Sequence, residues 1–337
     1  MALLQKGTVF AVDTETTIGA GQTGVWSNSD VIGFNEDSSM TPATESIERN
    51  ILNGSFLACP SLAGNETVSG SLNVEFGIQT VAGTEAGKLK AHNLFLAGLG
   101  VYAEQAADVD TVAKSISIEV DPVTNPTGYD LYKLSKPSDA RTTLCVREII
   151  GGNGDTVLDY KGVVVDSIAL NLTSGQIITA AFSVSGIGYN TATGQTVLAS
   201  LGCGANPFVV KSAKLSVDGT EIAAMDVSLT INNTNTDRMA ISSTGISDKV
   251  TTAKSIEVSY TLDMVNVAAY TKLKNNEVGT MFIELTNGVE KAFIYMPKIK
   301  INSVDKSSDS GVITLAMSSA AYPDTAGEPI YIATSKA

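Results

Sequence analysis

The chain has 337 residues, of which 43% are hydrophobic and 17% are charged, and this composition excludes an intrinsically disordered protein. It has 22 Lys and Arg against 35 Asp and Glu residues, a net charge of −13. Because such a surface repels phosphate backbones, tight binding of nucleic acid is disfavoured. The length allows two domains of ordinary size, each able to bury a core.

The cysteines and the N-terminus narrow the class of protein further. Cys59, Cys145 and Cys203 lie far apart, so their spacing indicates neither a zinc site nor a disulfide framework, and we expect buried thiols. The first residues lack the apolar run of a signal peptide, and no segment approaches the ~18 apolar residues of a membrane span. The sequence therefore predicts a soluble protein made inside the cell, with no membrane partner.

Residues 1–45 are rich in Gly, Ser, Thr and Asp around one expected strand at residues 8–12. We predict a flexible N-terminal region that makes assembly contacts and becomes ordered against neighbouring subunits. Trp26 lies in this region without an evident local core, so it is a candidate contact residue between subunits. Packing on its own domain is the alternative.

After this region, apolar and polar residues alternate with the two-residue period of half-buried strands. Turn signals at residues 151–155, 217–219 and 286–288 punctuate the strands, as β-hairpins require. The chain is therefore predicted to be mainly β. The expected strands lie near residues 116–120, 168–172, 177–184, 225–232, 256–263, 281–285 and 312–317.

Two segments predict short α-helices, each expected to cover one face of a sheet. The first spans residues 85–99, with Thr84 as its N-cap and Gly100 just after its C-terminus. The second spans residues 267–274 and follows Asn266 as its N-cap.

The two helices occupy matching positions in a predicted internal duplication. Residues 71–76 and 255–260 precede them with the same order of small, apolar, polar, Val, polar and aromatic residues. Residues 178–183 and 313–318 close the two halves in a similar way. We therefore predict tandem domains at residues 46–200 and 201–337, the first with an insertion at about 101–150.

A Gly-, Asn- and Pro-rich stretch, residues 185–207, is expected to connect the two domains, and the second is expected to begin near Phe208. Tyr189 and Asn190 lie in this stretch. With Trp26 they form our set of candidate self-assembly contacts.

The sequence offers little material for catalysis. His92 is the only histidine and lies in the first predicted helix, so histidine-based triads and multi-histidine metal sites are disfavoured. Residues 19–24 match GxGxxG, but the βαβ context of a dinucleotide site is missing. We therefore expect no enzyme activity and no cofactor.

Two groups of acidic residues could in principle bind calcium, but neither has EF-hand spacing. We interpret them as solvated loop carboxylates and expect no metal site. They are Asp108, Asp110 and Asp121, and Asp155 with Asp159.

Strand-and-turn patterns lie at residues 45–52, 68–75 with the helix that follows, 161–170, 175–182, and 208–219 leading into 225–232. These segments resemble the major tail tube proteins of siphophages, the long-tailed bacteriophages. The likeness covers most of residues 45–320, although it has no invariant chemical motif.

The resemblance implies two tandem tube-type β-sandwich or barrel domains, each with one short flanking α-helix. It further implies a structural virion protein that self-assembles into stacked rings, the tail tube through which phage DNA passes without tight binding. An acidic channel surface would suit that passage. The implied partners are copies of itself and the tape-measure, tail-terminator and distal tail proteins, after synthesis in the bacterial host cytoplasm.

Rings of this family commonly contain six tube domains, so a chain with two domains favours a homotrimer ring with pseudo-sixfold symmetry. A ring of six chains is the alternative. Two other functions stay open: a β-sandwich binding module, such as an adhesin or receptor-binding protein, and a hydrolase acting through paired carboxylates.

Overall fold

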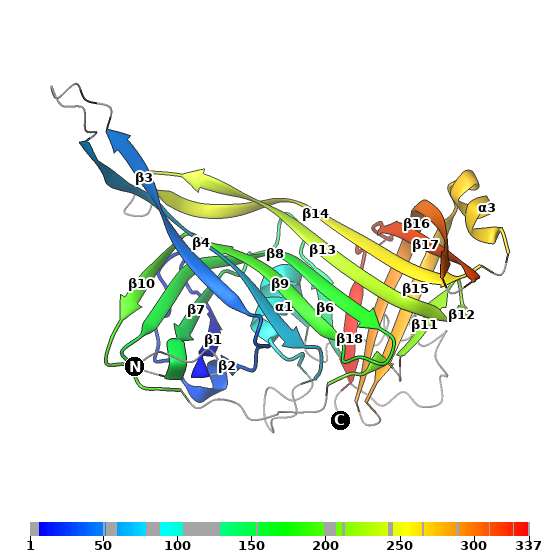
Figure 1. The fold of residues 1–337 in the computed structure, drawn as a ribbon, viewed down its shortest axis with the longest axis horizontal. Coiled ribbons are helices and arrows are strands. Elements are labelled where there is room, and N and C mark those ends of the chain that lie inside the picture. Colours follow the sequence, from blue (N-terminus) through cyan, green and yellow to red (C-terminus); the bar gives the residue numbers. More distant parts are fainter. Residues whose placement is uncertain are drawn as a thin grey trace.

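The structure is a computed structural model that describes residues 7–49, 51, 59–78, 88–103, 129–152, 154–198, 207–210, 213–241, 245–264, 266–287, 290–309, 311–325 and 327–335. Long antiparallel strands dominate it (Figure 1), and the prediction of a mainly β protein is confirmed. The predicted strand near residues 116–120 lies outside the described residues. The other six predicted strands fall on β8, β9, β13, β14, β15 and β17, whose bounds follow.

The elements fall into two groups along the chain. The first group is β1 (Val9–Thr14), η2 (Asn28–Asp30), β2 (Val31–Ile32), β3 (Ser39–Arg49), β4 (Cys59–Glu75), α1 (His92–Leu99), β5 (Gly100–Ala103), β6 (Tyr129–Leu134), β7 (Leu144–Ile149), η4 (Ile150–Gly152), β8 (Val157–Thr173), β9 (Thr179–Gly186) and β10 (Gly188–Ala192). The second group is β11 (Ala213–Val217), β12 (Thr220–Ile222), β13 (Ala224–Met239), β14 (Ile246–Asp263), α3 (Ala268–Asn275), β15 (Val278–Thr286), β16 (Lys291–Asp309), β17 (Val312–Ala321) and β18 (Tyr331–Ser335).

One antiparallel sheet runs through both groups in the order β3-β4-β9-β8-β13-β14-β17-β16. The two halves of the chain therefore share a sheet, and they meet where β8 pairs with β13. Every second residue of these strands faces the core, as the alternating pattern of the sequence requires. At this junction Leu170 and Ile168 lie opposite Leu229 and Ile231, and all four are buried.

Two long strands bend out of this sheet and continue into smaller sheets beneath it (Figure 1). The first part of β8 pairs with β7 and β10, and β7 continues to β1 and β2. The first part of β16 pairs with β15 and β18, which continue to β11 with β12 and to β6 with β5. β-Bulges accompany both bends, because an extra residue increases the local twist of a strand.

Helix α1 packs beneath the shared sheet, against β8, with Leu94, Phe95 and Leu99 completely buried. It ends at Gly100, whose φ of 102° and N–H bond to the Leu96 carbonyl make the C-terminal cap that the sequence predicts. The helix begins only at His92, so the predicted start at residue 85 is too early. The predicted N-cap, Thr84, lies outside the described residues.

Helix α3 is confirmed within one residue at each end, and it packs against β16. The Asn266 side-chain oxygen accepts a hydrogen bond from the Ala268 N–H at 2.8 Å, although Val267 occupies the N-cap position. In contrast to α1, none of its residues is buried.

The same pairings recur in the two halves of the chain. The β3–β4 hairpin, the β4–β9 pair and the β8–β9 pair have counterparts in β13–β14, β14–β17 and β16–β17. The β1–β7 and β8–β10 pairs likewise have counterparts in β11–β15 and β16–β18. Among the described strands, β5 and β6 have no counterpart in the second half, whereas β7, which lies inside the predicted insertion, corresponds to β15.

The registers differ in one detail from the sequence alignment. Ser183 and Ser318 occupy equivalent positions, because each lies opposite the serine that follows the β-bulge in the preceding strand, Ser167 and Ser303. Ser71 lies opposite Ser183, whereas Ser259 lies opposite Ser318. By these pairings Ser71 and Ser259 occupy equivalent positions, whereas the predicted duplication aligns Ser71 with Ser255.

The predicted connector also needs correction. Residues 188–192 form β10, which pairs with β8 from Gly188 opposite Lys161 to Ala192 opposite Val157. Phe208, expected to begin the second domain, packs its ring on Phe76 of the first half with a centroid distance of 5.8 Å. Residues 188–192 have the composition of a loop, but they form a strand because the edge of β8 is available for pairing. Composition alone does not encode such a tertiary contact.

Polar side chains from the second half donate hydrogen bonds to the C-terminus of α1. The Lys254 ammonium on β14 donates to the Leu99 carbonyl at 3.0 Å and to the Ser135 hydroxyl at 2.8 Å. The Asn233 amide on β13 donates to the carbonyls of Gly98 and Val165, each at 3.0 Å. These contacts supply donors to the carbonyls of Gly98 and Leu99 at the helix end, and the Leu99 carbonyl also accepts a hydrogen bond from the Ser135 N–H at 2.6 Å.

Close packing of α1 on β8 leads to the first prediction. A Cβ atom on Gly98 would lie 2.5 Å from Cδ1 of Ile168 and 3.2 Å from Cγ1 of Val165. We expect Gly98→Ala to lower the free energy of unfolding by about 1–3 kcal/mol through overpacking, despite the better helix propensity of alanine. Urea unfolding of the unassembled chain measures this, with Gly33→Ala as control, because nothing lies within 4 Å there. Equal stability of the two variants would contradict the packing argument.

The buried ammonium of Lys254 leads to the second prediction. Burial lowers its pKa from 10.5 to about 8, while Asp139 acts in the opposite direction. Between pH 8 and 10.5 the unfolded chain therefore binds more protons at this side chain, and its contribution to stability rises with pH. We expect Lys254→Met to cost about 1–3 kcal/mol at neutral pH through loss of the hydrogen bonds that the ammonium donates to Gly98, Leu99 and Ser135. The free energies of unfolding of the wild type and the variant should differ more at pH 9.5 than at pH 7.5. A smaller difference at pH 9.5 would contradict the lowered pKa of Lys254.

Candidate assembly surfaces

The shared sheet ends in two open edges among the strands that the structure describes. β3 pairs only with β4, and residues 303–309 of β16 pair only with β17. Each edge presents a row of backbone N–H and C=O groups that can pair with another strand. Because β3 and β16 run in opposite directions across the sheet, one edge can accept the other in an antiparallel ladder.

Both edges carry residues that discourage indiscriminate pairing. Pro42 lies in the middle of β3 and lacks a backbone N–H group, and Lys306 is exposed in the middle of the β16 edge. Proline and lysine are typical of sheet edges that avoid uncontrolled aggregation. The edges are therefore suited to one partner rather than to any strand.

The uncovered face of the shared sheet is lined by small polar side chains. The other face packs on α1 and on the smaller sheets, so only this one remains exposed over the whole sheet (Figure 1). Three rows of laterally paired residues cross it, and they contain Ser, Thr, Asn, Ala, two glutamates and one lysine. The rows are Ser39, Ser71, Ser183, Ser167, Asn232 and Ser255; Asn73, Ala181, Ala169, Thr230, Glu257, Ala320 and Lys300; and Glu75, Thr179, Asn171, Ser228, Ser259, Ser318 and Ser303.

Two hairpins extend from the end of the shared sheet on the same side of the molecule (Figure 1). On the β3–β4 hairpin, Ile47 and Leu62 lie opposite each other with exposed fractions of 49% and 56%. Met239 on β13 and Ile241 just beyond it are also exposed. Apolar side chains gathered on projecting hairpins are typical of surfaces that become covered by a partner.

The predicted contact residues lie on the smaller sheet of the first half. Residues 7–45, predicted to need neighbouring subunits for order, form β1, β2 and the start of β3, which pair with β7 and β4 of the same chain. Trp26 is only 9% exposed and packs with Val9, Ala11 and Val31, as the alternative for this residue expects. Contact of Trp26, Tyr189 and Asn190 with a second chain stays a prediction.

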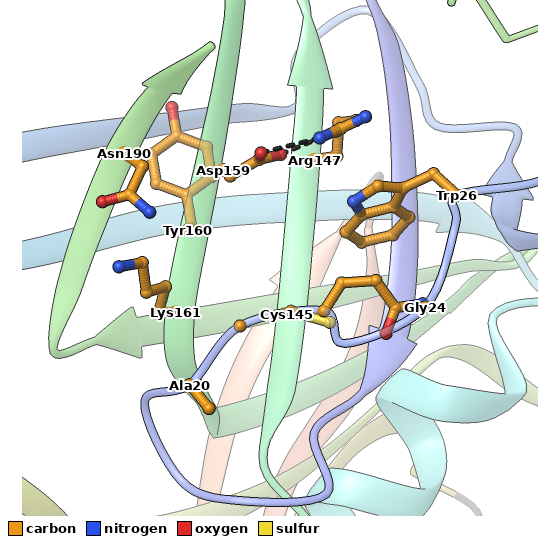
Figure 2. A pocket seen from close by; sticks show the side chains of 11 residues that line it. Ala20, Gly24, Trp26, Cys145, Arg147, Asp159, Tyr160, Lys161 and Asn190 are labelled. Atoms are coloured by element: carbon orange, nitrogen blue, oxygen red, sulfur yellow. Dashed lines mark hydrogen bonds and ion pairs between the residues drawn. The ribbon is translucent and has the colours of Figure 1, made fainter. Parts of the chain in front are cut away.

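Trp26 and Asn190 line one shallow pocket (Figure 2). The Arg147 guanidinium lies 5.3 Å from the centre of the Trp26 ring and donates two hydrogen bonds of 2.7 Å to the Asp159 carboxylate. Tyr189 pairs with Tyr160 across β10 and β8. At about 140 Å³ the pocket is smaller than ordinary ligand sites, and its main polar groups pair with each other.

The groups beside this pocket are held in unreactive states. Burial raises the pKa of the Cys145 thiol to about 12, so the nucleophilic thiolate is scarce at neutral pH. Burial also raises the pKa of the Tyr160 hydroxyl, which donates to the Glu148 carboxylate at 2.6 Å. Cys59 is half-buried, and Cys203 lies outside the described residues.

The GxGxxG segment binds a carboxylate of its own chain. The Glu15 carboxylate accepts hydrogen bonds from the N–H groups of Gly19 at 2.9 Å and Gly21 at 3.0 Å, and from Gly162 at 2.9 Å. No helix begins at this loop, since η2 starts only at Asn28. The loop therefore anchors Glu15 and lacks the helix terminus of a nucleotide site.

The remaining candidates for chemistry have structural partners. The Nδ1 atom of His92 lies 2.8 Å from the Tyr132 hydroxyl, within a cluster that includes Tyr102. Asp155 accepts from the Gly194 N–H, and Asp159 pairs with Arg147; Asp108, Asp110 and Asp121 lie outside the described residues. The described residues contain no group of three or more His, Cys, Asp and Glu side chains placed to hold a metal ion. Within this same part of the chain, no helix has the length and apolar character needed to cross a membrane.

Sequence reasoning missed the open edges and the projecting hairpins, because both follow from long-range pairing. The polar face had a local signal: the outward positions of the predicted strands are mostly Ser, Thr and Asn.

Comparison with known protein families identifies one match. The family described as phage tail tube protein matches residues 5–329, nearly the whole chain. A search of curated individual proteins finds no match. The chain therefore belongs to the phage tail tube protein family, a family of structural proteins of the bacteriophage virion.

Proposed function

We propose that the chain self-assembles into rings, and that the rings stack into a tail tube through which phage DNA passes. The observation that carries this proposal is the shared sheet with one open edge at each end. Joining the β16 edge of one chain to the β3 edge of the next extends the sheet from chain to chain, until it closes around a central channel. Closure satisfies the backbone groups of every edge that the shared sheet leaves unpaired.

An internal duplication underlies the proposed ring. The recurrent pairings support it, and so do the bulges, which fall at Asp166 between Val165 and Ser167, and at Asn302 between Ile301 and Ser303. Matched positions on the polar face also carry identical residues. These pairs are Ser39 and Ser228, Thr41 and Thr230, Ser71 and Ser259, Ser167 and Ser303, and Ser183 and Ser318.

We favour a ring of three chains, in which six similar units surround the channel. The β8–β13 junction inside each chain then alternates with an equivalent junction between chains, which gives pseudo-sixfold symmetry. A ring of six chains is the competing arrangement, and it would need a second half that does not take part in the closed sheet.

The polar face is proposed to line the channel, because α1 and the smaller sheets occupy the opposite face. Serine, threonine and asparagine side chains offer DNA no cationic contact, so no counterions are released when DNA is near them. Lys300 lies at the β16 end of one row. Of the two glutamates, Glu75 pairs with Lys90, whereas Glu257 adds repulsion. Such a surface lets DNA slide without sticking, in agreement with the net charge of the chain.

The projecting hairpins are proposed to contact the adjacent ring, where their exposed isoleucine and leucine side chains become buried. The ends of the tube then offer the same surfaces to the tape-measure, tail-terminator and distal tail proteins. The chain is made in the cytoplasm of the bacterial host before it enters the virion, which is that of a siphophage.

Self-assembly is tested by electron microscopy and mass measurement of the purified chain over a range of concentrations. We expect hollow tubes or rings whose mass equals three chains per ring. Six chains per ring would overturn the trimer while preserving the tube. If the tail-tip complex is needed for nucleation, tubes should appear when it is added, and a chain that stays monomeric even then would contradict the proposal.

The channel surface is tested by adding positive charge to it. Ser71→Lys with Ser259→Lys introduces lysines at matched positions on the polar face, where each gains phosphate contacts with passing DNA. We expect tubes to form and DNA ejection from complemented phage to slow several-fold, more strongly at low salt. The controls are Ser71→Ala with Ser259→Ala, and Glu221→Lys on the exposed strand β12. Ejection at the control rate in assembled phage would place the channel elsewhere.

A further inference from the structure

We infer that the junction between neighbouring chains copies the β8–β13 junction residue by residue, with Thr41 opposite Asp305 and Glu66 next to Lys274 of the adjacent chain. This inference rests on the proposed ring. It goes further by specifying the register of the contact and an ion pair.

The internal junction supplies the template. There β13 lies opposite β8 in one continuous register, which places Thr230 opposite Ala169 and Ser228 opposite Asn171. The residues on the core side of both strands are buried, so a slip by one residue would turn apolar side chains outward. The template therefore has a single register.

Matched positions transfer this register to the open edges. Ser71 matches Ser259, and their partners Ser39 and Ser228 therefore match as well. The bulges at Asp166 and Asn302 align β16 with β8. Counting from these positions gives the pairs between chains. On the polar face, Thr41 lies opposite Asp305 and Ser39 lies opposite Ser307. On the core side of the sheet, Met40 lies opposite Lys306 and Pro42 lies opposite Val304.

The side chains at the open edges suit this register. The Thr41 hydroxyl can donate to the Asp305 carboxylate on the polar face, and the aliphatic part of Lys306 can cover Met40, which is already buried in one chain. The corresponding internal positions are leucines, Leu170 and Leu229. The junction between chains is thus more polar than its template, and the polar edges keep the unassembled chain soluble.

The helices provide an independent sign of the same contact. In the template, the Lys254 ammonium donates a hydrogen bond to the carbonyl of Gly98 at 3.3 Å. Gly98 lies two residues before Gly100, which caps the C-terminus of α1. The position that matches Lys254 is Glu66, five residues before Ser71 as Lys254 is before Ser259. In α3 the residue two before the capping Asn276 is Lys274.

The C-terminal turns of α1 and α3 differ in where their positive charge comes from. The last turn of α1 has no basic residue and receives an ammonium group from β14, whereas the last turn of α3 carries Lys272 and Lys274. Lys272 already pairs with Asp218, while the side chain of Lys274 is exposed. A carboxylate from β4 of the next chain is the complementary group for Lys274, and Glu66 is half-buried at the required place.

Disulfide trapping tests the register in assembled tubes. In a background with Cys59→Ser and Cys203→Ser, the variant Thr41→Cys with Asp305→Cys is oxidised and run on a denaturing gel. Opposed residues of neighbouring strands lie close enough for a disulfide after a small adjustment. We expect covalent oligomers up to the number of chains per ring. Thr230→Cys with Ala169→Cys is the positive control, because it should close within one chain.

An out-of-register pair is the matched negative control. Ser39→Cys with Ser303→Cys also lies on the polar face, but the proposed partner of Ser39 is Ser307, four residues and about 13 Å farther along the strand. Equal cross-linking of this pair and the Thr41–Asp305 pair would overturn the register. If the background protein forms tubes and the Thr41–Asp305 pair does not cross-link, the register fails and the tube stands. If the background protein never assembles, the proposed function itself fails.

Charge reversal tests the ion pair without cysteines. We expect Glu66→Lys and Lys274→Glu each to raise the concentration needed for assembly several-fold, and the double variant to return it towards the wild-type value. Glu221→Lys, on the exposed strand β12, serves as the control for a change in net charge. Double-variant assembly no better than that of the single variants would overturn the pairing of Glu66 with Lys274.

Discussion

The backbone hydrogen-bonding groups at the ends of one sheet constrain the rest of this structure. A strand in the middle of the sheet satisfies its N–H and C=O groups on both sides, but β3 and the end of β16 satisfy only one side within the described chain. The chain has no element packed along these edges in its described part. In the proposed ring, a second copy is the partner that supplies the same geometry at every junction.

The contrast between α1 and α3 follows from the same constraint. Both helices pack on a long bent strand and end in a residue with positive φ, yet α1 is buried and α3 is not. Helix α1 lies beside the internal junction, where β13 and β14 supply Asn233 and Lys254. Helix α3 lies on the strand whose edge is open, so the residues around it are polar and charged until another chain arrives.

The sequence predicts the local part of this fold and misses the part that depends on distant pairing. Alternation identifies strands such as β13 and β14, because one face is buried and the other is polar. It does not identify β10, whose Gly, Asn and Thr residues form a strand only because β8 offers an edge. The strand pairings align Ser71 with Ser259, four residues from the match that the sequence predicts, and the reason is related: a shift by an even number of residues leaves the two-residue pattern intact. The contact residue Trp26 looked coreless because its neighbours Cys145 and Ile149 are far away in the sequence.

Weak edges are an advantage for a protein that must assemble in order. An apolar edge like that of the internal junction would pair in solution with any available strand, whereas Pro42, Lys306 and Asp305 make each single contact weaker. In a closed ring every chain is held at two junctions, so loss of one chain requires both to break at once. Stability of the proposed ring thus comes from closure more than from any one contact, and the unassembled chain stays soluble until enough copies meet. In the proposed tube, the polar edges and the polar channel surface serve the same end: the tube forms only as a whole and does not retain the DNA inside it.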